Sequence, residues 1–202
     1  MNRKFAIIGH RAQSSGKLNL NDLAGSSGRI DVLARAVNTG LFLSHGIRED
    51  SEVILHLEGG PGPVRRIGFV GETIRGVHPD ERAISGHLNK ALKNPVTPIG
   101  VKHEINSGLW HSGGSIQQTI SEWERSGTKI FVLDANGTEF DPILHNSEKI
   151  GFILSDDQPF TDEENESMEK YHRISLGKQW LQGHACIAII HHQLDSMMNP
   201  SR

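Results

Sequence analysis

The sequence predicts an α/β fold with a mostly parallel sheet flanked by helices, and three observations carry this prediction. Short apolar runs that end at glycine or at a polar residue indicate buried strands. Segments with apolar residues three and four positions apart lie between these runs and indicate helices. Strands and helices that alternate along a chain are typical of a parallel sheet with covered faces.

The expected strands are recognised by their apolar runs and by the turns between them. Buried strands are expected at 4–9, 129–134, 150–154 and 173–176. The runs 52–57 and 66–70 flank the glycine- and proline-rich segment 59–63, so we expect them to form a hairpin. The triplet 135–137, Ala-Asn-Gly, is a strong turn signal and is expected to end the strand before it. A further extended piece is expected near 100–105.

The expected helices are marked by periodicity and by the residues of their first turns. They are expected at 30–41, 79–93, 116–126, 162–171 and from Cys186 onward. Pro79 is expected at the first helical position, where its missing N–H is tolerated. Ser115 with Gln118, and Thr161 with Glu164, have the form of capping boxes.

The composition indicates a single folded domain over residues 1–202. Hydrophobic residues make up 36% and charged residues 22%, which allows a core and excludes disordered and collagen-like classes. The proline-rich segment 94–100 is the expected insertion or hinge linker. The apolar run 185–190 is far shorter than the roughly 20 residues of a membrane helix. No membrane role is therefore expected, and the single Cys186 favours a reducing cytoplasm.

Charge and nucleophiles restrict the possible functions only partly. Acidic residues outnumber basic ones by 24 to 21, so any nucleic-acid site must be a local patch. The 12 histidines show no zinc-binding spacing, and no metal is expected. The chain has neither a P-loop nor a dinucleotide fingerprint. Cys186 is better explained as a small packed side chain at a helix start than as a nucleophile.

Several segments are similar to one known family. They are Leu20-Asn21-Asp22-Leu23, Gly28-Arg29 with Asp31, the run 42–48, Pro79-Asp80-Glu81-Arg82, and His184 to Asp195 with its central Cys186-Ile187. Together they resemble the archaeal tRNA pseudouridine N1-methyltransferases and their bacterial relatives, over nearly the whole chain. These enzymes are SPOUT methyltransferases.

The resemblance implies a fold feature, a cofactor and an assembly. It implies a C-terminal trefoil knot, which is an exception to the rule that chains do not thread loops. It also implies a homodimer with the active site at the subunit interface, and S-adenosylmethionine (SAM) held largely by backbone groups. Position by position, it assigns the cofactor to Leu133, Ser155, Gly177, Leu181 and Cys186. Ser155 stands where the family usually has glycine, and the segments 178–180 and Gly183 also differ from the archaeal pattern.

The reaction of the family moves a methyl group from sulfur to N1 of a pseudouridine, so an RNA, with tRNA foremost, is the expected partner. Asp31 is the candidate for orienting or deprotonating the base, while Arg29 and Arg35 grip phosphate or stabilise the developing anion. Asp31 is equally well explained as a first-turn acid that stabilises its helix. The candidate basic surface consists of Arg48, Arg65, Arg66, Arg75 and Arg82.

Two other classes of function compete with this one. One is a SAM-binding or RNA-binding module without methyl transfer, which would bind the cofactor without turnover. The other is a small-molecule methyltransferase, which the net negative charge mildly favours. Salt-dependent binding of tRNA separates this last class from an RNA methyltransferase. The Gly/Ser loop 14–28 either closes over the base or only connects two elements.

Overall fold

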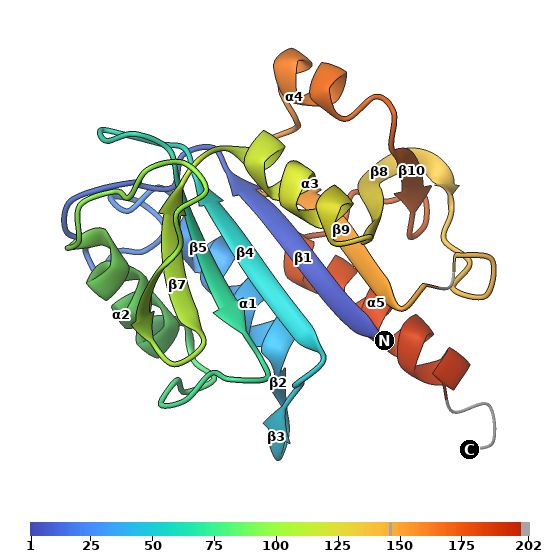
Figure 1. The fold of residues 1–202 in the computed structure, drawn as a ribbon, viewed down its shortest axis with the longest axis horizontal. Helices are drawn as coiled ribbons and strands as arrows, with labels where there is room; N and C mark the ends of the chain where they lie inside the picture. Colours follow the sequence, from blue (N-terminus) through green and yellow to red (C-terminus); the bar gives the residue numbers. More distant parts are fainter. Residues whose placement is uncertain (146, 199–202) are drawn as a thin grey trace.

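The computed structural model describes residues 1–145 and 147–198 (Figure 1). Its strands are β1 (Asn2–Gly9), β2 (Phe42–Leu43), β3 (Gly46–Ile47), β4 (Ser51–Leu57), β5 (Arg65–Val70), β6 (His103–Asn106), β7 (Leu109–Gly113), β8 (Lys129–Glu139), β9 (Lys149–Ser155) and β10 (His172–Ser175). Its helices are α1 (Ile30–Leu41), α2 (Glu81–Leu92), α3 (Ile116–Arg125), α4 (Asp162–Ser167) and α5 (Gly183–Met198). In the described residues, no helix has both the length and the apolar character that a membrane span requires.

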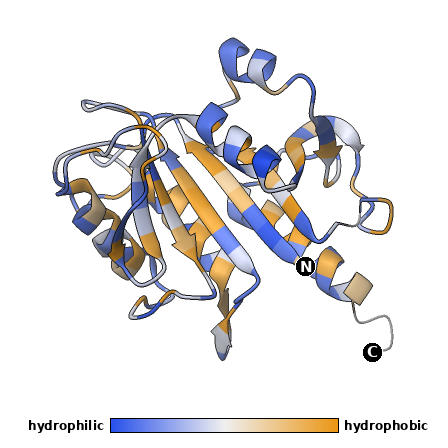
Figure 2. Cartoon of the chain, viewed as in Figure 1, coloured by the Kyte–Doolittle hydropathy of each residue, from blue (hydrophilic) through white to orange (hydrophobic). Residues whose placement is uncertain are grey.

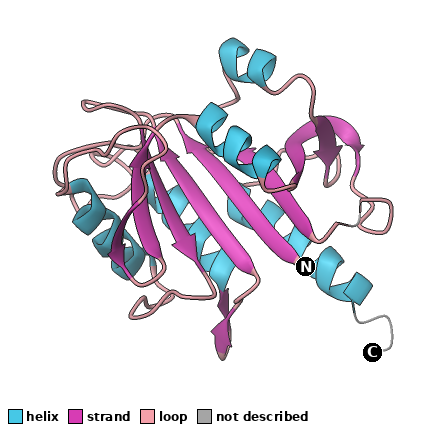
Figure 3. Ribbon diagram, in the orientation of Figure 1, coloured by secondary structure: helices cyan, strands magenta, loops and turns pink. Residues whose placement is uncertain are grey.

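One sheet has the strand order β10-β8-β9-β1-β4-β5-β7-β6, and helices flank it (Figure 3). Neighbouring strands from β10 to β4 are parallel, whereas the pairs from β4 to β6 are antiparallel. The α/β class is therefore confirmed, and so is the hairpin, which pairs 52–57 with 65–70. β2 and β3 form a separate small hairpin.

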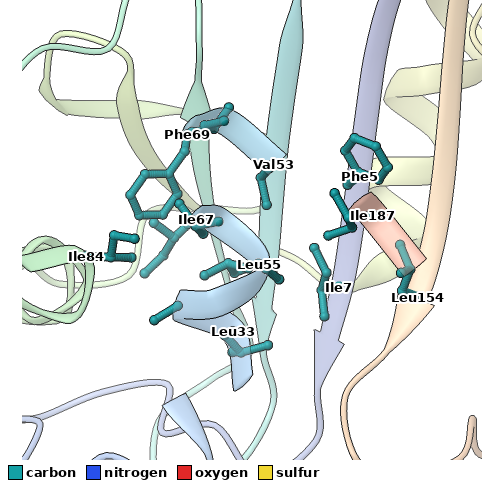
Figure 4. Close-up of a cluster of buried hydrophobic side chains, with 14 of the residues drawn as sticks. Phe5, Ile7, Leu33, Val53, Leu55, Ile67, Phe69, Ile84, Leu154 and Ile187 are labelled. Carbon is teal, nitrogen blue, oxygen red and sulfur yellow. The ribbon is translucent and has the colours of Figure 1, made fainter. Parts of the chain in front are cut away.

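Apolar side chains on both faces of the sheet form the core. On one face, Phe5 and Ile7 of β1 and Leu55 of β4 pack with Leu33 of α1 and Ile187 of α5 (Figure 4). The other face packs under α3 in a second cluster. Hydrophobic residues concentrate on the central strands, as Figure 2 shows. Full burial of each such side chain contributes about 1.5–3 kcal/mol, so this core fixes the strands that carry the site.

Of the two predicted capping boxes, one is formed and one is not. The Thr161 capping box is formed, but its helix ends at Ser167 and does not reach residue 171. Ser115 precedes α3 without capping it, because its hydroxyl contacts the side chain of Gln117 instead. Pro79 was expected inside the second helix. It lies one residue before the actual cap, Asp80, whose carboxylate accepts the Ala83 N–H at 2.7 Å.

One strand prediction was wrong, and one strand was not predicted. The triplet 135–137 does not end its strand, since β8 continues to Glu139 with a bulge opposite 173–174 of β10. A Cβ at Gly137 would lie 2.7 Å from the Arg173 backbone, so glycine serves the close strand contact here. The strand β7 was not predicted, because its buried residues include His111 and Ser112. The segment 94–100 connects α2 to β6, and its role as a hinge stays a prediction.

Candidate functional site

A pocket of about 650 Å³ opens at the edge of the sheet where β9 and β10 end. Leu133 of β8, Leu154 of β9 and Leu176, which follows β10, give it apolar walls. Most of the rest of its lining comes from the loops after β9 and β10 and from the start of α5, and Arg29 and Val32 contribute from the start of α1. In open α/β sheets, ligands usually bind outside the carboxyl ends of the strands, and this pocket has that position.

The residues that the resemblance assigns to the cofactor all line this one pocket, namely Leu133, Ser155, Gly177, Leu181 and Cys186. Gly177 has a φ of 121°, a conformation that side chains rarely adopt. The Ser175 hydroxyl holds the turn by accepting the Gly177 N–H at 3.1 Å and donating to its carbonyl at 2.8 Å. Burial raises the pKa of the Cys186 thiol to about 11, so the thiol is protonated at neutral pH. This agrees with a packing role for Cys186.

Arg29 lies in the lining of the pocket, at the residue that precedes α1. Its φ of 65° is left-handed, which is uncommon for a residue other than glycine. Gly28 has a φ of 68°, and a Cβ there would lie 1.7 Å from the carbonyl oxygen of Arg11. Position 28 therefore requires glycine, and the strained backbone sets where the Arg29 side chain leaves the chain.

Arg29 belongs to a series of ion pairs that runs from the pocket to α2. Its Nε and Nη2 donate to the two carboxylate oxygens of Asp31 at 2.9 and 3.1 Å, and its Nη1 donates to Asp157 at 3.1 Å. Arg35 donates to Asp31 at 2.6 Å and to Glu81 at 2.9 Å. Burial alone would raise the pKa of Asp31, but Arg29 and Arg35 outweigh burial and lower it. Asp31 is thus ionised, buried and bound to two guanidinium groups.

A second charged cluster beside the pocket was not predicted from the sequence. The His10 ring contacts Asp156 through Nδ1 at 2.9 Å and Glu164 through Nε2 at 3.0 Å. Hydrogen bonds to Asp156 and then to Glu164 raise the pKa of His10 to about 10, against the effect of burial. The signal that could have found it is position, because His10 directly follows β1 and Asp156 directly follows β9. Both are carboxyl ends of parallel strands.

The candidate RNA-binding arginines lie in different places. Arg82 is exposed in the first turn of α2, and Arg35 is half-buried between Asp31 and Glu81. Arg48 lies at the opposite edge of the sheet from the pocket and donates to both carboxylate oxygens of Asp195, at 2.7 and 3.2 Å. Their roles in RNA binding stay predictions.

Two members of the expected basic surface are buried, so that prediction was wrong for them. Arg65, 2% exposed, donates to the carbonyl groups of Ala91 and Asn94 at the end of α2. Arg66, 0% exposed, donates to Glu122 and to two hydroxyl groups on the other face of the sheet. Both guanidinium groups are buried with their Nη atoms hydrogen-bonded, and a sequence pattern does not show such partners.

The fold and the site define an α/β protein with a pocket at the carboxyl edge of its parallel strands and an ion-paired arginine in the pocket lining. In the part of the chain that the structure describes, no three His, Cys, Asp or Glu side chains are placed to hold a metal ion. The chain belongs to the family described as "Putative SAM-dependent RNA methyltransferase", which matches residues 2–199.

Individual relatives cover almost the whole chain. The tRNA (pseudouridine(54)-N(1))-methyltransferase of Methanococcus vannielii is 34% identical over 198 residues, which is 96% of this chain and 99% of the relative. That of Methanosarcina mazei is 37% identical over 196 residues, 96% of this chain and 90% of the relative. The structure of Archaeoglobus fulgidus Nep1 bound to S-adenosylhomocysteine has a TM-score of 0.70 at 11% identity, over 98% of this chain and 99% of that one. The resemblance seen in the sequence motifs is therefore confirmed.

Proposed function

We propose that the protein transfers a methyl group from SAM to N1 of a pseudouridine in tRNA. The observation that carries the proposal is the single pocket that contains all five expected cofactor residues together with Arg29. The relatives support the choice of base, since enzymes named for this reaction match the chain almost from end to end. The three-dimensional likeness supports the fold on which such a site is built.

The chemistry of the pocket suits a nucleoside cofactor. Its volume of about 650 Å³ is within the usual range for small-molecule sites. Leu133, Leu154 and Leu176 offer flat apolar surface for a purine ring, and the loops beside them offer main-chain donors and acceptors. Ser155, which replaces the usual glycine, turns its hydroxyl to the carbonyl of Gln158 in its own loop, so the substitution suits the pocket. When bound, SAM supplies an electrophilic methyl group on a positively charged sulfur.

The residues near the rim must promote reaction at a poor nucleophile. N1 of pseudouridine gives its proton to solvent water and gains the methyl carbon, whose bond to sulfur breaks to leave S-adenosylhomocysteine. Because the proton is lost ahead of bond formation, negative charge develops on the base and its carbonyl oxygens. The Arg29 guanidinium in the pocket lining is suited to stabilise that charge. Asp31 has both oxygens bound by arginines and a lowered pKa, which favours an orienting role for Asp31 over proton abstraction.

We extend the proposal to the RNA surface, the assembly and the chain path. Arg35 belongs to the series of ion pairs that leads from the pocket to Glu81 of α2, and the exposed Arg82 is the next residue along the chain, so this path is suited to phosphate contacts. The side chains of Trp180 and Leu181, at the pocket, are 74% and 40% exposed, which favours a homodimer partner or an RNA base covering them.

A knot is supported by the path from the outer strand β10 to α5, which packs on α1. A tRNA substrate also favours the cytoplasm.

The test is methyl transfer to a defined RNA. Purified protein is incubated with SAM and two tRNA transcripts that carry either pseudouridine or uridine at position 54. Mass spectrometry of the digested nucleosides is expected to show N1-methylpseudouridine in the first transcript and no methylated product in the second.

Three other outcomes separate the competing functions. SAM binding and tRNA binding without product would indicate a binding module and overturn the proposal. Product on free nucleoside, with tRNA affinity that does not depend on salt, would indicate a small-molecule methyltransferase. Activity that persists in protein diluted to monomers would contradict the proposed dimer alone.

A further inference from the structure

Four ionisable side chains from different elements meet beside the proposed cofactor pocket. His10 follows β1, Glu58 follows β4, Asp156 follows β9, and Glu164 belongs to α4. Three of the four are carboxyl groups, and His10 is the basic group in contact with two of them. The cluster connects the ends of three strands to the short helix α4. The position of this helix and of the loop before it therefore depends on the charges in the cluster.

The geometry of His10 is that of a partly buried, ion-paired ring. Its main-chain N–H donates to Oδ2 of Asp156 at 2.9 Å, and its Nδ1 contacts Oδ1 of the same carboxylate at 2.9 Å. Its Nε2 contacts Oε2 of Glu164 at 3.0 Å. The side chains of His10, Asp156 and Glu164 are 14%, 1% and 8% exposed. Carboxylates accept hydrogen bonds, so both ring nitrogens donate and the ring is positively charged.

The two carboxylates also organise the segment 156–164. Asp156 accepts the Gln158 N–H at 2.9 Å, and Glu164 accepts the Thr161 N–H at 2.7 Å in the capping box of α4. Between them lie residues that line the pocket, among them Asp157, the ion-pair partner of Arg29. His10 therefore contacts both ends of a segment that forms one wall of the pocket.

We infer that His10 is a positioning residue for methyl transfer, because its ring holds the wall segment 156–164 against the sheet and so shapes the cofactor pocket. The inference rests on the proposed function, since it takes this pocket to bind SAM. Without the cation of His10, the carboxylates of Asp156 and Glu164 would face each other and Glu58 in a partly buried space. Burial, and then the charge of Glu164, already raise the pKa of Glu58, so added negative charge is unfavourable there.

The test compares binding of S-adenosylhomocysteine, the product form of the cofactor, by calorimetry at pH 8 and pH 5.5. At pH 8, His10→Gln is expected to weaken binding about tenfold or more, because it leaves two buried carboxylates without their cation. At pH 5.5 the difference in affinity between His10→Gln and the wild type is expected to shrink, because one carboxyl group can take up a proton. The double variant His10→Gln with Glu164→Gln is expected to recover affinity at pH 8. The matched control is His87→Gln in α2, another buried histidine, whose Nε2 contacts the Gly76 carbonyl at 3.1 Å.

Few other charged groups near the cluster could cause a difference in binding between pH 8 and pH 5.5. The charged groups that face it are Glu58 after β4, Glu163 in α4, and Arg11 and Arg29, which both contact Asp157. Both arginines keep their charge between pH 5.5 and pH 8, so a pH-dependent difference between the variant and the wild type reports on the carboxyl groups.

Each result bears on a distinct claim. Wild-type protein that does not bind S-adenosylhomocysteine would overturn the proposed function, whatever His10 does. Wild-type binding with equal affinity in His10→Gln at both pH values would overturn the inference alone. A loss of affinity in His10→Gln that is independent of pH and persists in the double variant would also overturn the inference, because lost packing would give this result. If His10→Gln does not fold, nitrogen NMR of the wild-type ring decides, because a neutral His10 at pH 8 would contradict the inference.

Discussion

The two edges of the parallel strands carry clusters of the same residue types in different surroundings. At the carboxyl edge, Arg29 and Arg35 share Asp31, and the Arg29 side chain is 31% exposed in the lining of a pocket. At the amino edge, Arg3 and Arg48 share Asp195, and the Arg3 side chain is 1% exposed. The first cluster places a partly exposed arginine in the lining of a pocket, whereas the central arginine of the second is buried and only its acidic partners are partly exposed.

The amino-edge cluster joins β1, α1 and α5. Arg3 lies within 3.0 Å of Asp50 and donates to Asp195 at 2.7 Å and to Nδ1 of His191 at 3.0 Å. The other ring nitrogen of His191 donates to the Gly40 carbonyl at 3.2 Å. Burial, and then Arg48 and Arg3, lower the pKa of His191 to about 3, so the ring is neutral. Similar ion pairs thus connect three elements at one edge and place an arginine in the pocket lining at the other.

The largest expected effect of a substitution at either edge is the loss of cofactor affinity when a charge is placed in the pocket wall at the carboxyl edge. Leu133→Glu puts a carboxylate against the proposed purine site, and we expect affinity for S-adenosylhomocysteine to fall by about 10²-fold or more, measured by calorimetry. Val101→Glu is the control, because Val101 is 52% exposed and lies outside this pocket. Equal affinity in both variants would refute the placement of the cofactor.

The next effect is expected for the arginine in the pocket lining, and it falls on turnover instead of on cofactor binding. Arg29→Ala is expected to lower kcat/KM for methyl transfer by about 10²-fold while cofactor affinity changes much less, because the guanidinium stabilises charge that develops on the base. Asp31→Asn should cause a smaller loss, since Arg29 keeps its contact with Asp157. The control is Arg125→Ala, in α3 on the other face. Full activity of Arg29→Ala would rule out its catalytic role.

The smallest effect is expected for a substitution at the amino edge, where the quantity that changes is the stability of the fold. Arg48→Ala is expected to lower the free energy of unfolding by about 1–3 kcal/mol, measured by urea denaturation, because it removes two charge-assisted hydrogen bonds to Asp195. Burial raises the pKa of Asp195, but Arg48 and Arg3 outweigh it and lower the pKa. Asp195 therefore stabilises the fold above about pH 4, and the difference between Arg48→Ala and wild type should shrink as the pH falls below that value. Weaker tRNA binding at unchanged stability would instead support the predicted RNA contact of Arg48.

The sequence predicted those parts of the fold in which local pattern and burial agree. The apolar runs of β1 and β9 and the periodicity of α1 are examples. It failed where polar residues are buried by partners distant in the chain. His111 lies in a fully buried strand, and Arg66 receives its acceptors from β7 and α3. The turn signal at 135–137 correctly marks an irregular backbone, but the pairing with β10 turns it into a bulge.

The candidate site could be predicted by resemblance only in part. The five expected cofactor residues are separated by up to 53 positions and meet only because the bulge of β8 that begins at Leu133 lies at the same edge as the ends of β9 and β10. Periodicity carries no information about this convergence. The contacts of His10 with Asp156 and Glu164 span 146 and 154 positions, and such contacts depend on the register of the whole sheet.

The pair of left-handed residues at 28 and 29 has a practical consequence for protein engineering. The starting point of the arginine side chain is fixed by main-chain geometry that tolerates no side chain at Gly28, so substitutions there would move the guanidinium and disturb the loop together. Attempts to redirect this scaffold to other bases should therefore leave this turn intact and vary the exposed Trp180 instead.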